Sequence, residues 1–309
     1  MLSKVKMNFP ALNRLKIRRV NDFYKMCKRR KNTFEQELDS SNYGYLEERL
    51  QQELPYSLKT YYPVKLLRKG VLKDKRVLVD QWPDFKTVLV TDKQRMSTPH
   101  RVYCFCKDDN STLVDSILRQ VSNELGSSLV LFGCSPGITD ELIKMNGSFV
   151  RRLIEDTSML MFPRENFKNL KKLTLPDGFK EKRLEEENVE LVLSNLQYRE
   201  AKEYIVHMIN ILPSTCILNK DDKPVAWILQ QEYGCCGMLH VMPEYRRLNL
   251  GSIVGQLQAE KIFENGDEVY SWVDKTNHPA LTYNLKNGVV PLPDFIVTCS
   301  EYMYRRVTN

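Results

Sequence analysis

The feature that most constrains this chain is a basic turn that joins an apolar strand to an amphipathic helix. The turn lies within Val241-Met242-Pro243-Glu244-Tyr245-Arg246-Arg247-Leu248-Asn249-Leu250-Gly251-Ser252, between a strand expected over 234–241 and a helix expected over 252–263. A helix start leaves backbone N–H groups without partners, and the helix dipole adds about half a positive charge. Gly251 lets an anion approach without a Cβ in the way. The segment predicts a phosphate-binding loop, although most arginine-rich turns are solvated loops.

Helices and strands alternate around this turn. We expect a strand over 179–184, helices over 189–196 and 201–211, strands over 215–218 and 225–229, and, after the turn, a strand over 268–273, a helix over 277–286 and a strand over 295–304. Asn188 and Asn277 are placed to cap the helices that follow them. This order predicts a layered α/β structure.

The first half has a similar but less regular pattern. We expect a helix over 43–54, strands over 77–79, 87–90 and 101–106, a helix over 113–125, and strands over 128–132 and 158–162. Residues 163–169 are polar and without periodicity, which indicates a linker. We therefore expect an α/β (α+β) fold with an N-terminal extension over 1–41 and two domains, over 42–168 and 169–309, each with a mixed central sheet flanked by helices.

The positive charge of the chain is confined to its start. The 309 residues carry a net charge of +7, but residues 1–32 hold 11 basic residues against Asp22, and the rest hold 35 basic and 38 acidic residues. A basic arm on a near-neutral body gives no reason to expect a nucleic-acid-binding surface on the folded part. No apolar run approaches the roughly 18 residues that a membrane span needs, so we expect no membrane partner.

The eight cysteines and the first twenty residues bear on compartment. No pair has C-x-x-C spacing, so we expect neither a metal site nor a redox pair, and we expect reduced thiols inside the cell. The start has no secretory signal but is similar to a mitochondrial transit peptide, with Leu12, Leu15 and Val20 on one helical face. A disordered tail and a nuclear-localisation cluster at Lys28 to Lys31 are the alternatives. We expect a mitochondrial protein, with a cytoplasmic one as the alternative.

The second half resembles the GNAT acyl-CoA-dependent N-acyltransferases. Their loop motif, R/Q-x-x-G-x-G/A, is similar to Arg246, Asn249 and Gly251, where asparagine tolerates the left-handed backbone of the first glycine. Asn277-His278-Pro279-Ala280 resembles the start of the family's helix beside the pantetheine arm, and is also an ordinary N-cap. The resemblance implies that acyl-CoA is bound by Leu239, Val241, Arg246, Arg247, Leu248, Asn249, Leu250, Gly251, Ser252 and Asn277.

Four motifs are similar to those of the glycine N-acyltransferase family, over about residues 42 to 309. They are Leu54-Pro55-Tyr56-Ser57-Leu58-Lys59, Val79 to Val88 with Trp82-Pro83-Asp84-Phe85, Leu212-Pro213-Ser214-Thr215-Cys216, and Pro243-Glu244-Tyr245-Arg246. The Trp82 to Phe85 block is the most specific, and its rings predict a buried staple around a turn. The resemblance implies two GNAT-like folds, of which the first has lost the phosphate loop.

The resemblance implies direct transfer of an acyl group from a CoA thioester to the amino group of glycine or a similar amino acid. Acyl-CoA is then a co-substrate, with no permanently bound cofactor, no metal, and a monomer as the expected state. Backbone N–H groups at Leu239 to Val241 can polarise the thioester carbonyl. The family's glutamate base is replaced by Cys235, whose ordinary role is a small core residue. Glu232, His240 and Glu244 are nearby alternatives, with His240 on the opposite strand face unless a bulge intervenes.

Cys235 and His240 are therefore the catalytic candidates. The superfamily's tyrosine acid falls at Asn284, with Tyr283 one position away and about 100° around the helix. These replacements leave two alternatives to an amino-acid N-acyltransferase. One is an acyl-CoA-binding protein without efficient turnover, and the other is a GNAT N-acetyltransferase that acts on another amine.

Overall fold

The computed structural model describes residues 36–94, 99–154, 157–196, 200–292 and 296–303. The basic arm predicted as a targeting segment lies almost entirely outside the described residues. The folded part begins earlier than the expected boundary between 41 and 42, which is a correction. Strand β1, Gln36–Glu37, already pairs with the sheet, and Leu38 is buried in the core.

The first half is built on a seven-stranded sheet with the order β1-β2-β3-β4-β5-β14-β6. Its strands after β1 are β2 (Lys75–Val79), β3 (Thr87–Asp92), β4 (His100–Cys106), β5 (Leu129–Cys134), β6 (Val150–Ile154) and β14 (Thr298–Tyr302). All neighbours are antiparallel except β4 and β5, which are parallel.

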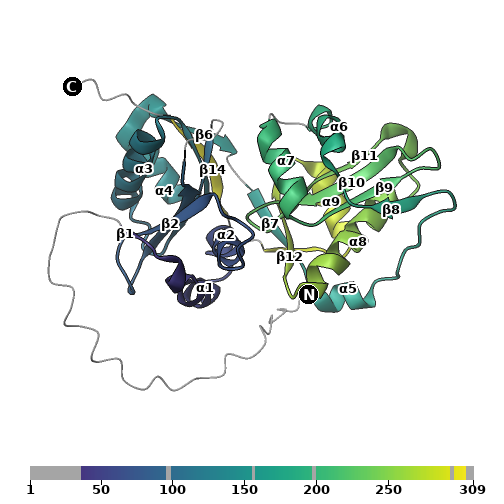
Figure 1. Cartoon of the computed structure of the whole chain (residues 1–309), viewed down its shortest axis with the longest axis horizontal. Coiled ribbons are helices and arrows are strands. Elements are labelled where there is room, and N and C mark those ends of the chain that lie inside the picture. The colour runs from purple at the N-terminus through teal and green to yellow at the C-terminus, as the bar shows by residue number, and fades with distance from the viewer. Residues whose placement is uncertain (1–35, 95–98, 155–156, 197–199, 293–295, 304–309) are drawn as a thin grey trace, which may run out of the picture. The chain divides into compact units, whose positions relative to one another are not determined.

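Helices cover both faces of this sheet (Figure 1). They are η1 (Ser40–Asn42), α1 (Tyr43–Gln51), α2 (Leu58–Arg68), α3 (Ser111–Leu125), α4 (Pro136–Asn146) and η2 (Gly147–Phe149). Side chains alternate along the strands, so that Val88 and Val90 pack with α1 and α2, whereas Leu89 packs with α3. Two cores, one on each face, follow from this alternation.

The second half has two sheets. One has the order β11-β10-β9-β8 and the other β12-β7-β13. The strands are β7 (Thr157–Phe162), β8 (Lys180–Lys182), β9 (Ser214–Leu218), β10 (Pro224–Gln230), β11 (Cys236–Val241), β12 (Val269–Asp274) and β13 (Val290–Leu292). The helices are α5 (Arg164–Asn169), η3 (Glu186–Asn188), α6 (Val189–Ser194), α7 (Lys202–Ile211), η4 (Pro243–Tyr245), α8 (Leu250–Glu264) and α9 (His278–Lys286).

The two halves exchange strands across the proposed boundary between 168 and 169. Strand β7 precedes the boundary but pairs with β12 and β13, and β14, at the end of the chain, pairs with β5 and β6. The prediction of an irregular linker over 163–169 is wrong. Helix α5 forms there, and the ring of Phe167 packs on Phe162 and Phe263. The sheets therefore do not follow a linear division of the sequence.

Most predicted elements are confirmed within one to three residues. The stacked rings of Trp82 and Phe85, with centroids 6.2 Å apart, form the predicted staple, in which Phe85 is buried and Trp82 is half-buried. Asn188 does not cap α6 as predicted; its Oδ1 instead accepts a hydrogen bond from the N–H of Glu185, 2.9 Å away, in a capping box around η3. Besides β1, α5 and the short 3-10 helices, the elements absent from the prediction are α2, α4, β6 and β13.

Three further observations concern only the described part of the chain. No helix there has the length and apolar content needed to cross a bilayer. No group of three or more His, Cys, Asp or Glu side chains comes together there in a way that could hold a metal ion. Seven cysteines there carry free thiols.

Candidate acyl-transfer site

The second half lacks a backbone ladder between two strands that frame its loop. Strand β11 leads into the loop, α8 follows it, and β12 comes next in the chain, yet among the described residues β11 and β12 belong to different sheets. A hydrogen bond ties the residue before β11 to β12: Sγ of Cys235 accepts from the backbone N–H of Trp272, 3.2 Å away. Backbone groups of both strands are thus left for another molecule.

A β-bulge interrupts the pairing of β11 with β10. Trp227 pairs with His240 and Leu229 pairs with Gly237, so β11 carries one residue more than β10 over this stretch. Met238 has a φ of 56°, which is left-handed. The extra residue reverses the alternation, so His240 lies on the same face as Cys235. Because a bulge is present, the regular alternation that would place these two side chains on opposite faces does not apply.

The loop after β11 leads to a helix start without a side-chain cap. Asn249 is the N-cap of α8, has a φ of 59° and makes no capping hydrogen bond. The first helical bond runs from the N–H of Ile253 to the carbonyl of Asn249, so the N–H groups of Leu250, Gly251 and Ser252 have no acceptor within the helix. This geometry is suited to an anion such as a diphosphate.

Basic side chains flank these N–H groups. Arg246 and Arg247 are exposed, and Nε of Arg246 donates to the carbonyl of Val241 at 3.2 Å. Arg247 has a φ of 68°, so the loop holds two left-handed residues, this one and Asn249. Leu248 is also exposed, whereas Leu250 is buried and contributes only its backbone. The predicted loop residues are therefore brought together with two positive charges.

The end of β11 and the start of α9 complete the surroundings of the loop. Leu239 and Val241 pack against α8, and a Cβ at Gly251 would lie 3.5 Å from Cγ2 of Val241. Asn277 caps α9, with its Oδ1 accepting from the N–H of Ala280 at 3.1 Å. The hydroxyl of Tyr283 donates to the carbonyl of Gly251 at 2.8 Å. Asn277 thus serves its own helix, and Tyr283 ties α9 to α8.

Cys235 is a buried thiol. Burial raises the pKa of Cys235 to about 12, so the thiol keeps its proton at neutral pH. Its sulfur already accepts the N–H of Trp272. The residue therefore has the properties of a core side chain and not those of a base.

His240 has the protonation state that a base requires. Burial, and then the charge of Arg246, lower its pKa from the ordinary value, so the imidazole is mainly neutral at pH 7. Its ring stacks on Trp227, with centroids 4.9 Å apart, and Nε2 has no hydrogen-bond partner among the described residues. A neutral imidazole with a free nitrogen can accept a proton.

The two carboxylate candidates for the base, Glu232 and Glu244, lie in different surroundings. Glu232 is buried, accepts the hydroxyl of Tyr103 and forms an ion pair with Lys75 at 3.3 Å. Glu244 is exposed in η4. Of the four residues considered from the sequence, His240 alone combines a suitable protonation state with an unused nitrogen in the described structure.

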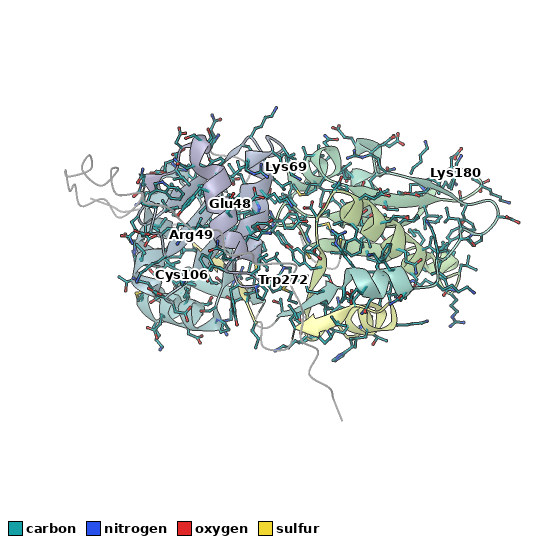
Figure 2. All side chains as sticks on the ribbon, turned by 90° about the horizontal axis from the view of Figure 1, so that it is seen from below. Glu48, Arg49, Lys69, Cys106, Lys180 and Trp272 are labelled. Carbon is teal, nitrogen blue, oxygen red and sulfur yellow. The ribbon has the colours of Figure 1, made fainter. Side chains whose placement is uncertain are left out.

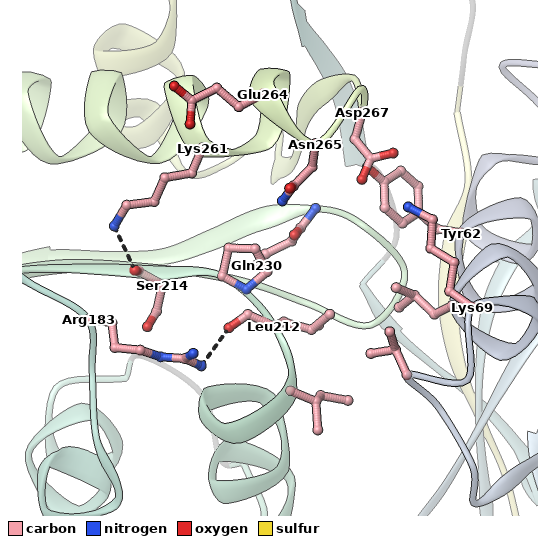
Figure 3. Close-up of a pocket in the computed structure, with 14 residues that line it drawn as sticks. Tyr62, Lys69, Arg183, Leu212, Ser214, Gln230, Lys261, Glu264, Asn265 and Asp267 are labelled. Atoms are coloured by element: carbon pink, nitrogen blue, oxygen red, sulfur yellow. Dashed lines mark hydrogen bonds between the residues drawn. The ribbon is translucent and has the colours of Figure 1, made fainter.

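A cavity of about 570 Å³ lies at the other end of α8 (Figure 3). Its lining includes Tyr62, Arg183, Gln230 and Lys261. Nζ of Lys261 donates to the carbonyl of Ser214 at 3.1 Å, and Arg183 donates to that of Leu212. Since α8 has 15 residues, about 22 Å separates its two ends. The cavity is therefore distinct from the loop, and two of its cations, Arg183 and Lys261, are engaged by the protein.

Comparison with known families gives two matches, one in each half. The family described as aralkyl acyl-CoA:amino acid N-acyltransferase matches residues 38–108, and the family described as FR47-like protein matches residues 217–284. The glycine N-acyltransferase of Homo sapiens is 24% identical over 274 residues, covering 80% of this chain and 92% of the relative. The glycine N-phenylacetyltransferase of Bos taurus is 25% identical over 274 residues, with the same coverage.

Solved structures give the fold. A Drosophila protein solved by X-ray crystallography matches with a TM-score of 0.72 and 16% identity, over 88% of this chain and 99% of that protein. A tandem GNAT protein from the clavulanic acid biosynthesis pathway matches with a TM-score of 0.56 and 11% identity, over 89% of this chain and 99% of that protein. The predicted α/β architecture with GNAT folds is confirmed.

Proposed function

We propose that this chain, which belongs to the glycine N-acyltransferase family of GNAT proteins, transfers an acyl group from a CoA thioester to the amino group of glycine or a similar amino acid. The observation that carries the proposal is the unpaired edge of β11, with its bulge, beside the uncapped start of α8. A diphosphate fits the N–H groups of Leu250 to Ser252 together with Arg246 and Arg247. The thioester arm then follows the opening between β11 and β12.

The bulge gives the acyl group a place to react. Around Met238 and Leu239 the ladder with β10 is interrupted, so backbone N–H groups can donate to the thioester oxygen. Negative charge develops on that oxygen as the amine attacks, and donors fixed in advance stabilise it. Because these donors belong to the backbone, the replacement of the family's glutamate by Cys235 leaves this part of the site intact.

His240 acts as the base in this proposal. The acceptor amine has a pKa of about 8 or above and is mainly protonated at neutral pH, so it must lose a proton before it attacks. The imidazole of His240 is neutral at that pH and shares its strand face with Cys235, the position of the family's base. The C–S bond breaks as the C–N bond forms, which releases the CoA thiolate.

A second candidate function is acyl-CoA binding without efficient turnover. Asn284 stands where the superfamily has its tyrosine acid, and its Oδ1 accepts from the hydroxyl of Ser271 at 3.2 Å. An amide cannot supply a proton to the departing thiolate. The neighbouring Tyr283 has a pKa raised by burial, and its hydroxyl is bonded to Gly251.

Thiol release separates the two functions. The full chain is mixed with a panel of acyl-CoAs, with glycine, with glutamine or without acceptor, and the free thiol is measured. Acceptor-dependent release, with formation of the N-acyl amino acid, is the expected result. Binding of acyl-CoA without acceptor-dependent thiol release would contradict acyl transfer and favour the acyl-CoA-binding function.

A further inference from the structure

Lys59 is a buried lysine without a negative partner. It lies at the start of α2 and is 5% exposed, and no described residue forms a hydrogen bond or an ion pair with its Nζ. The other buried charged side chains of the described chain have polar partners: Lys75, Asp92 and Glu232 share one network, and Asp115 binds Arg119 and Asn146. Burying a charge without a partner costs free energy, and an anion bound beside Lys59 would offset that cost.

Aromatic rings surround the Lys59 ammonium. Its Nζ lies 4.2 Å from the ring centroid of Trp272 (labelled in Figure 2), 5.4 Å from that of Tyr233 and 5.5 Å from that of Phe132. Ring faces stabilise a cation but carry no net charge. The cage therefore holds the ammonium in place without neutralising it.

The titratable groups that face Lys59 do not supply an anion. They are the thiols of Cys299 on β14, Cys235 before β11 and Cys134 on β5. Burial raises the pKa of Cys235 to about 12 and that of Cys299 to about 11, so both are neutral at pH 7. Burial also lowers the pKa of Lys59 to about 8, and about nine-tenths of the amine is still charged at pH 7.

The cage lies beside the acyl-transfer opening. Trp272, under the ammonium, donates its backbone N–H to Cys235, which occupies the family's base position. Tyr62, one turn along α2 from Lys59, lines the cavity of Figure 3. The ring of Tyr62 packs on Tyr270, which in turn contacts Trp272. A row of rings thus connects the cavity with the cage.

We infer that Lys59 binds the carboxylate of the amino-acid acceptor. The inference rests on the proposed function, because it takes the acceptor to be an amino acid. It adds that the acceptor is selected by its carboxylate and that the first half of the chain supplies the group that recognises it. An ammonium and a carboxylate in a buried site form a charge-assisted hydrogen bond, which an amide of the same shape cannot equal.

The test compares N-acetylglycine with N-acetylglycinamide, two product-like probes that differ only in the carboxylate. Calorimetry measures the Kd of both for the full chain, for Lys59→Met, and for Lys73→Met as a control at an exposed lysine. We expect the parent and the control to prefer the carboxylate about tenfold or more, and Lys59→Met to bind both probes equally. An unchanged preference in Lys59→Met, or a parent without preference, would overturn the inference.

A second measurement uses only the parent and does not depend on the folding of the variant. The carboxylate needs a charged Lys59, so the affinity for N-acetylglycine should fall as pH rises through about 8, while that for the amide stays constant. Equal pH dependence for both probes would contradict the inference. A carboxylate preference that depends on Lys59, without thiol release, would overturn the proposed function alone. Thiol release that is equally efficient with glycine and glycinamide would overturn the inference alone.

Discussion

The two halves contain the same strand–helix–strand unit in two states. In the first half, β4, α3 and β5 follow one another, and β4 and β5 are joined by a parallel ladder from His100 to Tyr103. In the second half, β11, α8 and β12 follow one another, and no backbone ladder between β11 and β12 occurs in the described chain. The same succession of elements therefore gives a closed sheet in one half and an open edge in the other.

The start of α3 is capped, whereas the start of α8 is not. In the first half, Oδ1 of Asn110 accepts from the N–H of Leu113 at 3.0 Å, and the preceding residues Asp108 and Asp109 are acidic. In the second half, Asn249 provides no side-chain cap and the loop carries two arginines. A capped helix start behind two carboxylates repels a phosphate, whereas an uncapped one behind two guanidinium groups attracts it. The comparison teaches that the site depends on the backbone hydrogen-bonding groups that the strand edge and the helix start leave without partners.

The largest effect should come from the bulged strand of the open half. His240→Ala should lower kcat about 10²- to 10⁴-fold, the usual contribution of a positioned base, while acyl-CoA affinity is retained. Cys235→Ser is the matched control, because Cys235 keeps its proton at neutral pH, and we expect kcat to change much less. Stopped assays of thiol release measure both.

The pH profile tests the same assignment. Burial lowers the pKa of His240 from its ordinary value, so the imidazole is mainly neutral at pH 7, and the rate should be level from pH 7 to 8 and fall on the acid side. A rate that climbs steadily towards the pKa of the acceptor amine would show that solvent removes the proton.

The next largest effect concerns a buried charge in the closed half. Nζ of Lys75 binds Asp92 at 2.6 Å and Glu232 at 3.3 Å, so Lys75→Met leaves two buried carboxylates without their cation. We expect a loss of about 3 to 5 kcal/mol in the free energy of unfolding. Lys59→Met is the matched variant, because it removes a buried cation without a partner and should not destabilise the fold. Denaturant titration measures the free energy of unfolding of both variants. Equal losses would contradict the assignment of a paired charge to Lys75 and an unpaired one to Lys59.

The loop of the open half should respond to charge. Arg246→Glu should weaken CoA binding about 100-fold, because a carboxylate replaces a guanidinium beside the diphosphate. Lys107→Glu makes the same change in the loop after β4 of the closed half and should leave CoA affinity unchanged. Calorimetry with CoA measures both. Equal affinities in Arg246→Glu and the parent would place the diphosphate elsewhere.

The smallest effect should come from the capped helix of the closed half. Asn110→Ala removes the acceptor for the N–H of Leu113 and should cost about 1 kcal/mol of stability. Asn249→Gly, at the uncapped start of α8, keeps the left-handed backbone and should leave stability within a few tenths of a kcal/mol. Thermal unfolding distinguishes the two, and a loss of equal size in both would mean that Asn249 makes a cap.

Local patterns in the sequence predicted much of this comparison. The loop before α8, the left-handed Asn249 and the buried Cys235 each depend on residues close together in the chain. Helix α2 was not predicted because nine of its eleven residues are buried, so it has no polar face to give a helical period.

Non-local features could not be predicted in the same way. The bulge at Met238 depends on the pairing of β11 with β10. Strand β7 pairs with β12, and β14 pairs with β5 and β6, and in each pair the two strands are more than a hundred residues apart in the sequence. Lys59 stands in a motif recognised from the sequence, but its missing counter-ion is visible only once Trp272 and the three thiols are in place. A sequence shows that a lysine is present, and a structure shows which charge it lacks.

The pairing of β14 has a consequence for the synthesis of the protein. Strand β14 inserts between β5 and β6, so the seven-stranded sheet stays incomplete until translation reaches residue 302. Strand β7 likewise waits for β12 and β13, which are made more than a hundred residues later. Contacts of such long separation are slow to form and leave strand edges exposed in the meantime. The two halves therefore mature together once residues up to 302 have been made, and neither can be cut out as a unit that folds by itself.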